Sequence, residues 1–141
     1  MTRELRAARL AAATREELVP LAERLLAGGG PEPIVVRPPE VGMVMLQTRE
    51  SVFDERFYLG EVLVTQCTVE VAGALGWCMR GDDDKVATLA AAYLDAIAAT
   101  GIPEAAEVEA LCATVADRLA HEDAAEWAAV APTTVAFEEL T

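Results

Sequence analysis

The chain has 141 residues, of which 53% are hydrophobic, and its 24 acidic and 11 basic residues give a formal net charge of -13. That length is sufficient for one domain with its own core and too short for two ordinary domains. A strongly negative surface repels phosphate backbones and anionic lipids, so the composition argues against binding to nucleic acid or to a membrane surface. The negative charge is concentrated in residues 82–141, which hold 13 acidic residues and two basic ones.

Residues 1–30 are expected to form a helical arm. Arginines recur at helical spacing and alternate with apolar residues over 2–14, which predicts a short helix with one basic and one apolar stripe. Thr14 and Glu17 have the spacing of a capping box that opens a second helix, and the glycines at 28–30 end it. The basic stripe is a surface that a neighbouring chain could cover.

Residues 31–81 are rich in β-branched and apolar residues, which predicts an antiparallel sheet. The expected strands are Ile34–Val36, Met43–Thr48, Phe57–Leu59 continuing into Glu61–Val71, and Ala74–Met79. Both faces of the run from residue 61 to 71 carry apolar or small side chains, so we expect it to be the central strand. A tight turn at 71–74 would join the last two strands, and Gly60 indicates either a bulge or a close approach of another backbone.

Residues 82–131 return to a period near 3.6 residues, which predicts two helices. The first runs from Asp83 to Gly101, and the aspartates at 82–84 are better explained by N-capping than by a metal site. The second begins near Pro103 and ends at about Val130, before Pro132. Its inward side chains are expected to be Val108, Leu111, Val115, Leu119 and Trp127. Residues 132–141 form a tail with strand character and no obvious strand to pair with.

These elements predict an α+β fold, an antiparallel β-meander of about four strands with N-terminal helical segments and two C-terminal helices. No apolar run reaches the roughly 18 residues that span a bilayer, and charges occur where a signal peptide has its apolar core, so we expect a cytoplasmic protein. Cys67, Cys78 and Cys112 form no CxxC pair and have apolar neighbours. We expect them to be buried thiols rather than parts of a disulfide or zinc site.

Motifs that support independent catalysis are missing from the sequence. GxxxxGK[ST], GxGxxG, GxSxG and HExxH do not occur. The lone His121 has no companion ligands at a metal-binding spacing, so it is expected to be structural or exposed. We therefore predict no catalytic residue, no metal and no bound cofactor in this chain.

A spaced constellation of polar residues and glycines is the most specific feature of the sequence. It comprises Arg37-x-x-Glu40-x-Gly42-x-Val44-x-x-Gln47-x-Arg49, then Arg56-Phe57-x-x-Gly60-Glu61-x-x-x-Thr65, then Gly76, Gly81-x-Asp83 and Leu94-Asp95-Ala96. This spacing, over roughly residues 36–97, resembles PhnG, a subunit family of the bacterial carbon–phosphorus lyase system. Three features differ from the family pattern: Asp82 stands where a basic residue is frequent, the helix that follows is offset by one residue, and the tail lacks the usual VxFFTMVRG.

The resemblance implies a role in phosphonate catabolism. In that pathway an assembly of PhnG, PhnH, PhnI and PhnL transfers an alkylphosphonate to ribose C1 of ATP and displaces adenine, and the radical iron–sulfur subunit PhnJ later cleaves the carbon–phosphorus bond. The chain would then be a non-catalytic or co-catalytic transferase subunit. Its implied partners are homologues of PhnI, PhnH and PhnJ, with PhnL joining for the transfer, and ATP is a co-substrate of the complex.

Two interpretations of the charged stretch Leu46–Glu61 stay open. In the first, it is a solvated hairpin loop whose ion pairs contribute about 0–1 kcal/mol each. In the second, its side chains converge with others at a partner interface or near the triphosphate and phosphonate, because arginine matches carboxylate and phosphate geometry. The candidate binding residues are Arg37, Glu40, Gln47, Arg49, Arg56 and Phe57, and the candidate backbone-critical residues are Gly42, Gly60 and Gly81.

A rival function, from a different class, is a stand-alone anion-binding or scaffold protein. In that case the loop with Arg49 and Arg56 would hold an anion without a partner subunit. Whether the isolated chain forms a homodimer is open in both cases.

Overall fold

The structure, a computed structural model, describes residues 1–135. Its elements are α1 (Arg3–Ala12), α2 (Arg15–Ala27), β1 (Ile34–Arg49), β2 (Arg56–Val71), β3 (Ala74–Arg80), α3 (Lys85–Thr100), α4 (Ala105–Val130) and the 3-10 helix η1 (Ala131–Thr133). The predicted α+β class is confirmed, with helices before and after one antiparallel sheet. The tail predicted to have strand character forms no strand over residues 132–135, because η1 takes in its first two residues, and residues 136–141 lie outside the described residues.

The sheet has three strands in the order β1-β2-β3, one fewer than expected. The predicted strands Ile34–Val36 and Met43–Thr48 both belong to β1. Pro38 and Pro39 break the alternating pattern in the sequence, but the strand continues past them through register shifts on both sides of Arg37. Prolines are tolerated there because β1 is an edge strand, where a backbone N–H need not pair.

The strand β2 is central, as predicted, and pairs with both neighbours. Near Gly60 the register skips one residue: Leu46 pairs with Gly60 and Gln47 with Tyr58, which leaves Leu59 as the extra residue of a bulge. The turn between β2 and β3 uses Ala72 and Gly73, both with positive φ, as a type I′ two-residue hairpin turn requires. Both features were expected from the sequence.

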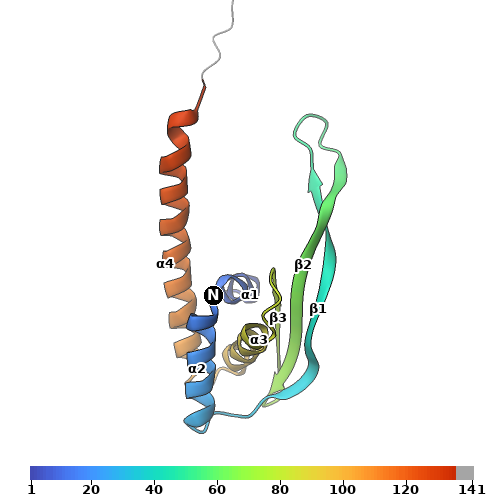
Figure 1. Cartoon of the computed structure of the whole chain (residues 1–141). Coiled ribbons are helices and arrows are strands. Elements are labelled where there is room, and N and C mark those ends of the chain that lie inside the picture. The colour runs from blue at the N-terminus through green and yellow to red at the C-terminus, as the bar shows by residue number, and fades with distance from the viewer. Residues whose placement is uncertain (136–141) are drawn as a thin grey trace, which may run out of the picture.

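Helix α3 lies at the centre of the molecule, between the sheet and the remaining helices (Figure 1). Its alanine-rich sequence allows the backbone of α3 to approach the sheet very closely. At Gly76 of β3 a Cβ would lie 2.1 Å from the Ala92 carbonyl oxygen and 2.4 Å from the Ala96 nitrogen. No side chain larger than hydrogen fits at this crossing without displacing α3.

The predicted helix caps are present. Thr14 and Glu17 form a reciprocal capping box at α2. Asp84 caps α3, because its Oδ1 accepts from the N–H groups of Val86 and Ala87 at 3.1 and 3.0 Å. Gly101 ends α3 in the left-handed conformation.

A buried carboxylate joins three elements. Asp95 on α3 is 1% exposed; its Oδ1 accepts from Arg6 Nε of α1 at 2.7 Å, and its Oδ2 accepts from the backbone N–H of Trp77 on β3 at 3.1 Å. A second α1 arginine, Arg3, donates to the Leu75 carbonyl oxygen. The arginines expected to form an open basic stripe on α1 are thus partly used inside this chain.

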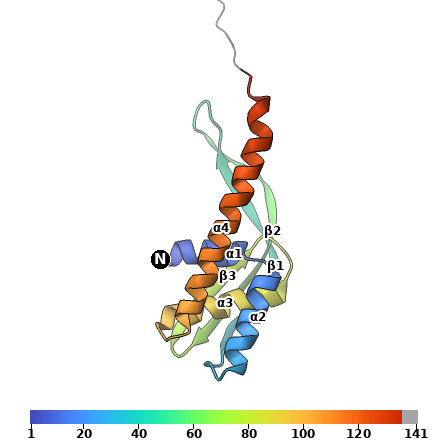
Figure 2. The same ribbon diagram turned by 90° about the vertical axis from the view of Figure 1, so that its left-hand side faces the viewer.

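The packed part of the molecule, formed by α1, α2, α3, β3 and the adjoining parts of α4, β1 and β2, is called the body here. Two parts of the chain extend beyond it in the same direction: the far end of α4 and the far end of the β1–β2 hairpin (Figure 1, Figure 2). Of the α4 side chains expected to point inward, Val108 and Val115 are buried, and Leu111 and Leu119 pack partly against the core. The prediction for Trp127 is wrong, since this residue is 67% exposed. Its helical spacing is correct, but α4 has run past the body by that point.

Candidate binding surface on the hairpin

The outer part of the β1–β2 hairpin, residues 43–63, touches little of the rest of the molecule. We call this segment the hairpin arm. Its side chains are exposed or half-buried on both faces of the two-stranded ribbon. Its exposed large apolar residues are Met43, Val44, Met45, Leu46, Val52, Phe53, Phe57, Tyr58, Leu59, Val62 and Leu63. Because an isolated two-stranded hairpin is marginally stable in water, a surface of this kind is typical of an element that another chain covers.

Three candidate binding residues meet near the tip of the hairpin arm. Arg49 of β1 pairs with Arg56 of β2, and Gln47, two residues before Arg49, pairs with Tyr58. Residues paired across an antiparallel ladder share a face, so Gln47, Arg49 and Arg56 lie on the same face. Together with Thr48 they line an open hollow of about 540 Å³. Two guanidinium groups and one amide give this hollow the chemistry to bind a carboxylate, a phosphate or a phosphonate.

The loop at the tip is organised by its own acidic residues. Arg49 forms an ion pair with Asp54. Glu50 accepts from the backbone N–H of Val52 at 2.8 Å and from that of Phe53. The Val52 bond is the main cause that lowers the pKa of Glu50. The first interpretation, a solvated loop, therefore accounts for Arg49 in part, whereas Arg56 has no ion pair within residues 1–135.

Arg37 and Glu40 are not brought to this group. They pair with Thr68 and Gln66, at the other end of the hairpin, where β1 lies on the body. Arg49 lies nine positions after Glu40 in the strand, which is roughly 30 Å at about 3.3 Å per residue. Glu40 therefore cannot orient the tip arginines within one molecule, and the expectation that all five polar residues converge is not met. Glu40 lines a different hollow, with Gln66 and Met79.

The remaining candidates have separate locations. Phe57 is 43% exposed and pairs with Thr48, next to the arginine pair. A Cβ at Gly42, Gly60 or Gly81 would meet no atom within 4 Å, and none of the three has a positive φ. Nothing within residues 1–135 requires glycine at these three positions, so any requirement for them would come from outside the described chain.

Other members of the constellation are explained by the fold. Thr65 is buried, and its Oγ1 donates to the Asp82 carbonyl oxygen at 2.7 Å. Gly76 permits the close contact with α3, and Asp95 joins α1, α3 and β3. The sequence pattern alone could not separate these structural members from the exposed ones. Burial separates them, and it leaves Gln47, Arg49 and Arg56 without a sufficient role inside the chain.

The three cysteines and His121 are the remaining candidates for nucleophilic or metal chemistry. The thiols are free and buried, and burial raises the pKa of Cys78 to about 12. His121 is exposed, and its Nδ1 lies 2.8 Å from the Asp117 carbonyl oxygen. Within the described residues no cluster of three metal-ligating side chains is found, and no helix there is long and apolar enough to cross a membrane.

Comparison with known proteins identifies what the chain is similar to. The profile of the family described as "Phosphonate metabolism protein PhnG" matches residues 1–141. A curated relative from Rhizobium meliloti (strain 1021), named "Alpha-D-ribose 1-methylphosphonate 5-triphosphate synthase subunit PhnG", is 36% identical over 108 residues. The match covers 76% of this chain and 69% of the relative. Both matches agree with the resemblance found from the spaced constellation.

Proposed function

Because the chain belongs to the PhnG family, we propose that it is a subunit of a synthase that makes α-D-ribose 1-methylphosphonate 5-triphosphate, the product in the name of its Rhizobium meliloti relative. The complex would transfer an alkylphosphonate to ribose C1 of ATP. A phosphonate oxygen forms the new bond to C1, the bond from C1 to the adenine nitrogen breaks, and adenine leaves. The chain supports this transfer as a non-catalytic or co-catalytic subunit, with homologues of PhnI, PhnH and PhnJ, and with PhnL in the transfer step.

The exposed hairpin arm is the observation that carries the proposal. A ribbon with apolar side chains on both faces and two arginines at its tip is a poor structure for a chain that works alone. It is a suitable structure for a subunit, since apolar and arginine side chains are the groups that anchor protein interfaces. Gln47, Arg49 and Arg56 would then meet either carboxylates of a partner or the triphosphate and phosphonate of the substrates.

Co-purification tests the subunit assignment. The chain is co-expressed with the PhnH, PhnI and PhnJ homologues of the same organism and analysed by size-exclusion chromatography. Adenine release from ATP and methylphosphonate is then measured after PhnL is added. We expect co-elution and a release of adenine that depends on this chain. Separate elution, together with turnover that is the same without the chain, would contradict the proposal.

The tip residues are tested by the variants Arg49→Ala and Arg56→Ala. Both side chains are exposed, so the thermal unfolding of the isolated chain should stay unchanged, while assembly or ribosyl transfer falls. Arg24→Ala is a matched control, because Arg24 is an exposed arginine in a surface ion pair with Glu107 on the body. If complexes with either tip variant assemble and release adenine like those with the Arg24 variant, Arg49 and Arg56 belong only to a solvated loop.

The stand-alone alternative has one observation in its favour, the hollow lined by Gln47, Thr48, Arg49 and Arg56. A stand-alone anion-binding protein should bind methylphosphonate or ATP without any other subunit. Isothermal titration of the isolated chain distinguishes the two functions. Tight binding that Arg56→Ala removes would favour the alternative, and absence of binding by the isolated chain together with co-elution would favour the subunit.

A further inference from the structure

One stripe of α4 changes its chemistry where the helix leaves the body. Positions 108, 112, 115, 119, 122 and 126 follow each other at spacings of three and four residues, so they lie on one side of the helix. Val108, Cys112 and Val115 on this stripe are fully buried. Further along, Glu122 and Glu126 are exposed, and so is every residue from 120 to 130. We call residues 120–130 the α4 arm.

The acidic groups of the α4 arm are only partly neutralised within this chain. Arg118, at the base of the arm, donates to Glu122, but it also donates to Glu17 of α2 and to the Ala12 carbonyl oxygen. Glu126 and Asp123 have no ion pair within residues 1–135. The inward stripe of α4 thus continues beyond the body with two carboxylates, those of Glu122 and Glu126.

Below its charged tip, the β1 strand of the hairpin arm is uncharged and largely apolar. The run from Val41 to Thr48 contains no charged residue. The apolar side chains on both faces of the arm are solvent-exposed, with Met43 at 60%, Met45 at 59% and Leu63 at 45%. An occupant that contacts this arm gains by presenting apolar side chains to it.

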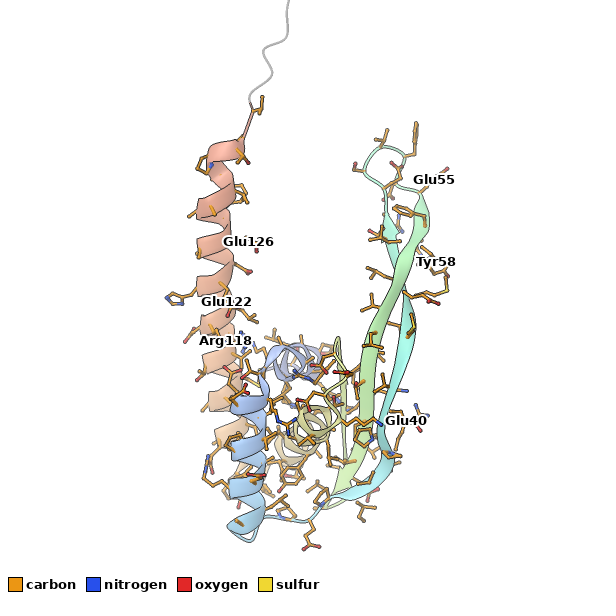
Figure 3. All side chains as sticks on the ribbon, in the orientation of Figure 1. Glu40, Glu55, Tyr58, Arg118, Glu122 and Glu126 are labelled. Atoms are coloured by element: carbon orange, nitrogen blue, oxygen red, sulfur yellow. The ribbon has the colours of Figure 1, made fainter. Side chains whose placement is uncertain are left out.

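The two arms extend in the same direction from opposite sides of the body (Figure 1), and Figure 3 shows Glu122 and Glu126 on the side of α4 that faces the hairpin. Within residues 1–135 no hydrogen bond or ion pair joins the α4 arm to the hairpin arm. Both surfaces are therefore free of contacts with each other, and one is apolar while the other carries carboxylates.

We propose that the two arms hold one segment of a partner subunit, with apolar side chains against the hairpin arm and lysine or arginine side chains against Glu122 and Glu126. The inference rests on the proposed function and adds where the partner sits and what chemistry it presents. Charge decides between a partner and a second copy of this chain. A second copy carries another net charge of -13, and it would place its acidic surface against the same carboxylates.

The test uses the co-expressed complex with the PhnH, PhnI and PhnJ homologues as the probe. The charge variant is Glu122→Lys with Glu126→Lys, and the apolar variant is Met45→Glu with Leu59→Glu. Their matched controls are Glu23→Lys with Glu109→Lys, two exposed glutamates on the body, and Leu75→Glu, an exposed leucine of β3. Every changed side chain is exposed, and circular dichroism with thermal unfolding confirms that each isolated variant folds like the wild type.

We expect each arm variant to lower the affinity for the partner subunits at least tenfold and the controls to change it less than twofold. The loss from the charge variant should shrink between 0.05 and 0.5 M salt, because screening weakens ion pairs. Wild-type co-elution with arm variants that bind like the controls would overturn this inference and leave the subunit assignment standing. Failure of the wild type to co-elute would overturn both. A dimer of the isolated chain that the arm variants dissociate would also overturn it, in favour of a second copy.

Discussion

Gly76→Ala tests the central packing of the fold. An alanine Cβ at this position would lie 2.1 Å from the Ala92 carbonyl oxygen and 2.4 Å from the Ala96 nitrogen. Ordinary contact begins at 3.4 Å, so α3 and β3 would have to separate by about 3.4 - 2.1 = 1.3 Å. Both obstacles are helix backbone, which cannot rotate away as a side chain does. Displacing α3 also disturbs its contacts with β2, α2 and α4.

Overpacking of a well-packed core costs about 1–3 kcal/mol and occasionally more. Because both obstacles are backbone atoms, we expect Gly76→Ala to lower the free energy of unfolding by about 3 kcal/mol or more. For a domain of this size, such a loss lowers Tm by roughly 10 °C. The assay is urea unfolding followed by circular dichroism, with thermal unfolding in parallel. Gly42→Ala is the control, because a Cβ there meets no atom within 4 Å and the backbone φ is ordinary. We expect the control to change stability by less than about 0.5 kcal/mol. A Gly76→Ala protein as stable as the Gly42→Ala protein would refute the close packing of α3 on β3.

Further outcomes follow from the buried and capping groups. Asp95→Ala should lower the free energy of unfolding by roughly 3–5 kcal/mol, measured by urea titration, because it leaves Arg6 and the Trp77 N–H without their buried partner. Burial raises the pKa of Cys78 to about 12, so a thiol reagent at pH 8 should label it only after unfolding. Above the ordinary thiol pKa of 9.0, the unfolded chain loses the Cys78 proton while the folded chain keeps it, which favours unfolding. The urea midpoint should therefore fall as pH rises above that value. The backbone N–H of Ala87 and the side chain of Arg15 lower the pKa of Asp84. The stability that Asp84 contributes is therefore present above the ordinary carboxyl pKa of 3.8 and is lost in more acidic solution. The urea midpoint of Asp84→Asn should accordingly depend less on pH, between about pH 2 and 6, than that of the wild type.

Local signals in the sequence predicted the element boundaries well. Thr14 with Glu17, Asp84 and Gly101 each mark a helix end with a residue whose side chain or backbone suits that end. The turn at Ala72 and Gly73 is set within four residues. These features depend on neighbours in the chain, which a sequence displays directly.

Features that depend on where the body ends were less predictable. The helical spacing that places Val108 and Val115 in the core continues to Trp127, but nothing in the spacing shows that the sheet and the other helices stop short of it. Pro38 and Pro39 likewise broke the strand pattern without breaking the strand, because an edge strand tolerates residues that a central strand does not.

The candidate site was predictable in composition but only partly in geometry. Alternation along two paired strands places Gln47, Arg49 and Arg56 on one face once the register is known. The distance from Glu40 to that face depends on the length of uninterrupted strand, which the four-strand prediction underestimated. The roles of Gly76 and Asp95 required the packing of α3, a contact between distant segments.

The buried pair between Arg6 and Asp95 joins residues 89 positions apart in the chain, and Arg118, which binds the Ala12 carbonyl oxygen, comes later still. On the ribosome, α1 and α2 emerge before α3, but the carboxylate that receives Arg6 is synthesised only with α3. The N-terminal helices must therefore wait in an incompletely packed state, with their apolar faces open, until α3 and then α4 leave the exit tunnel. The two helices that precede the sheet in the chain are thus among the last elements to reach their final place.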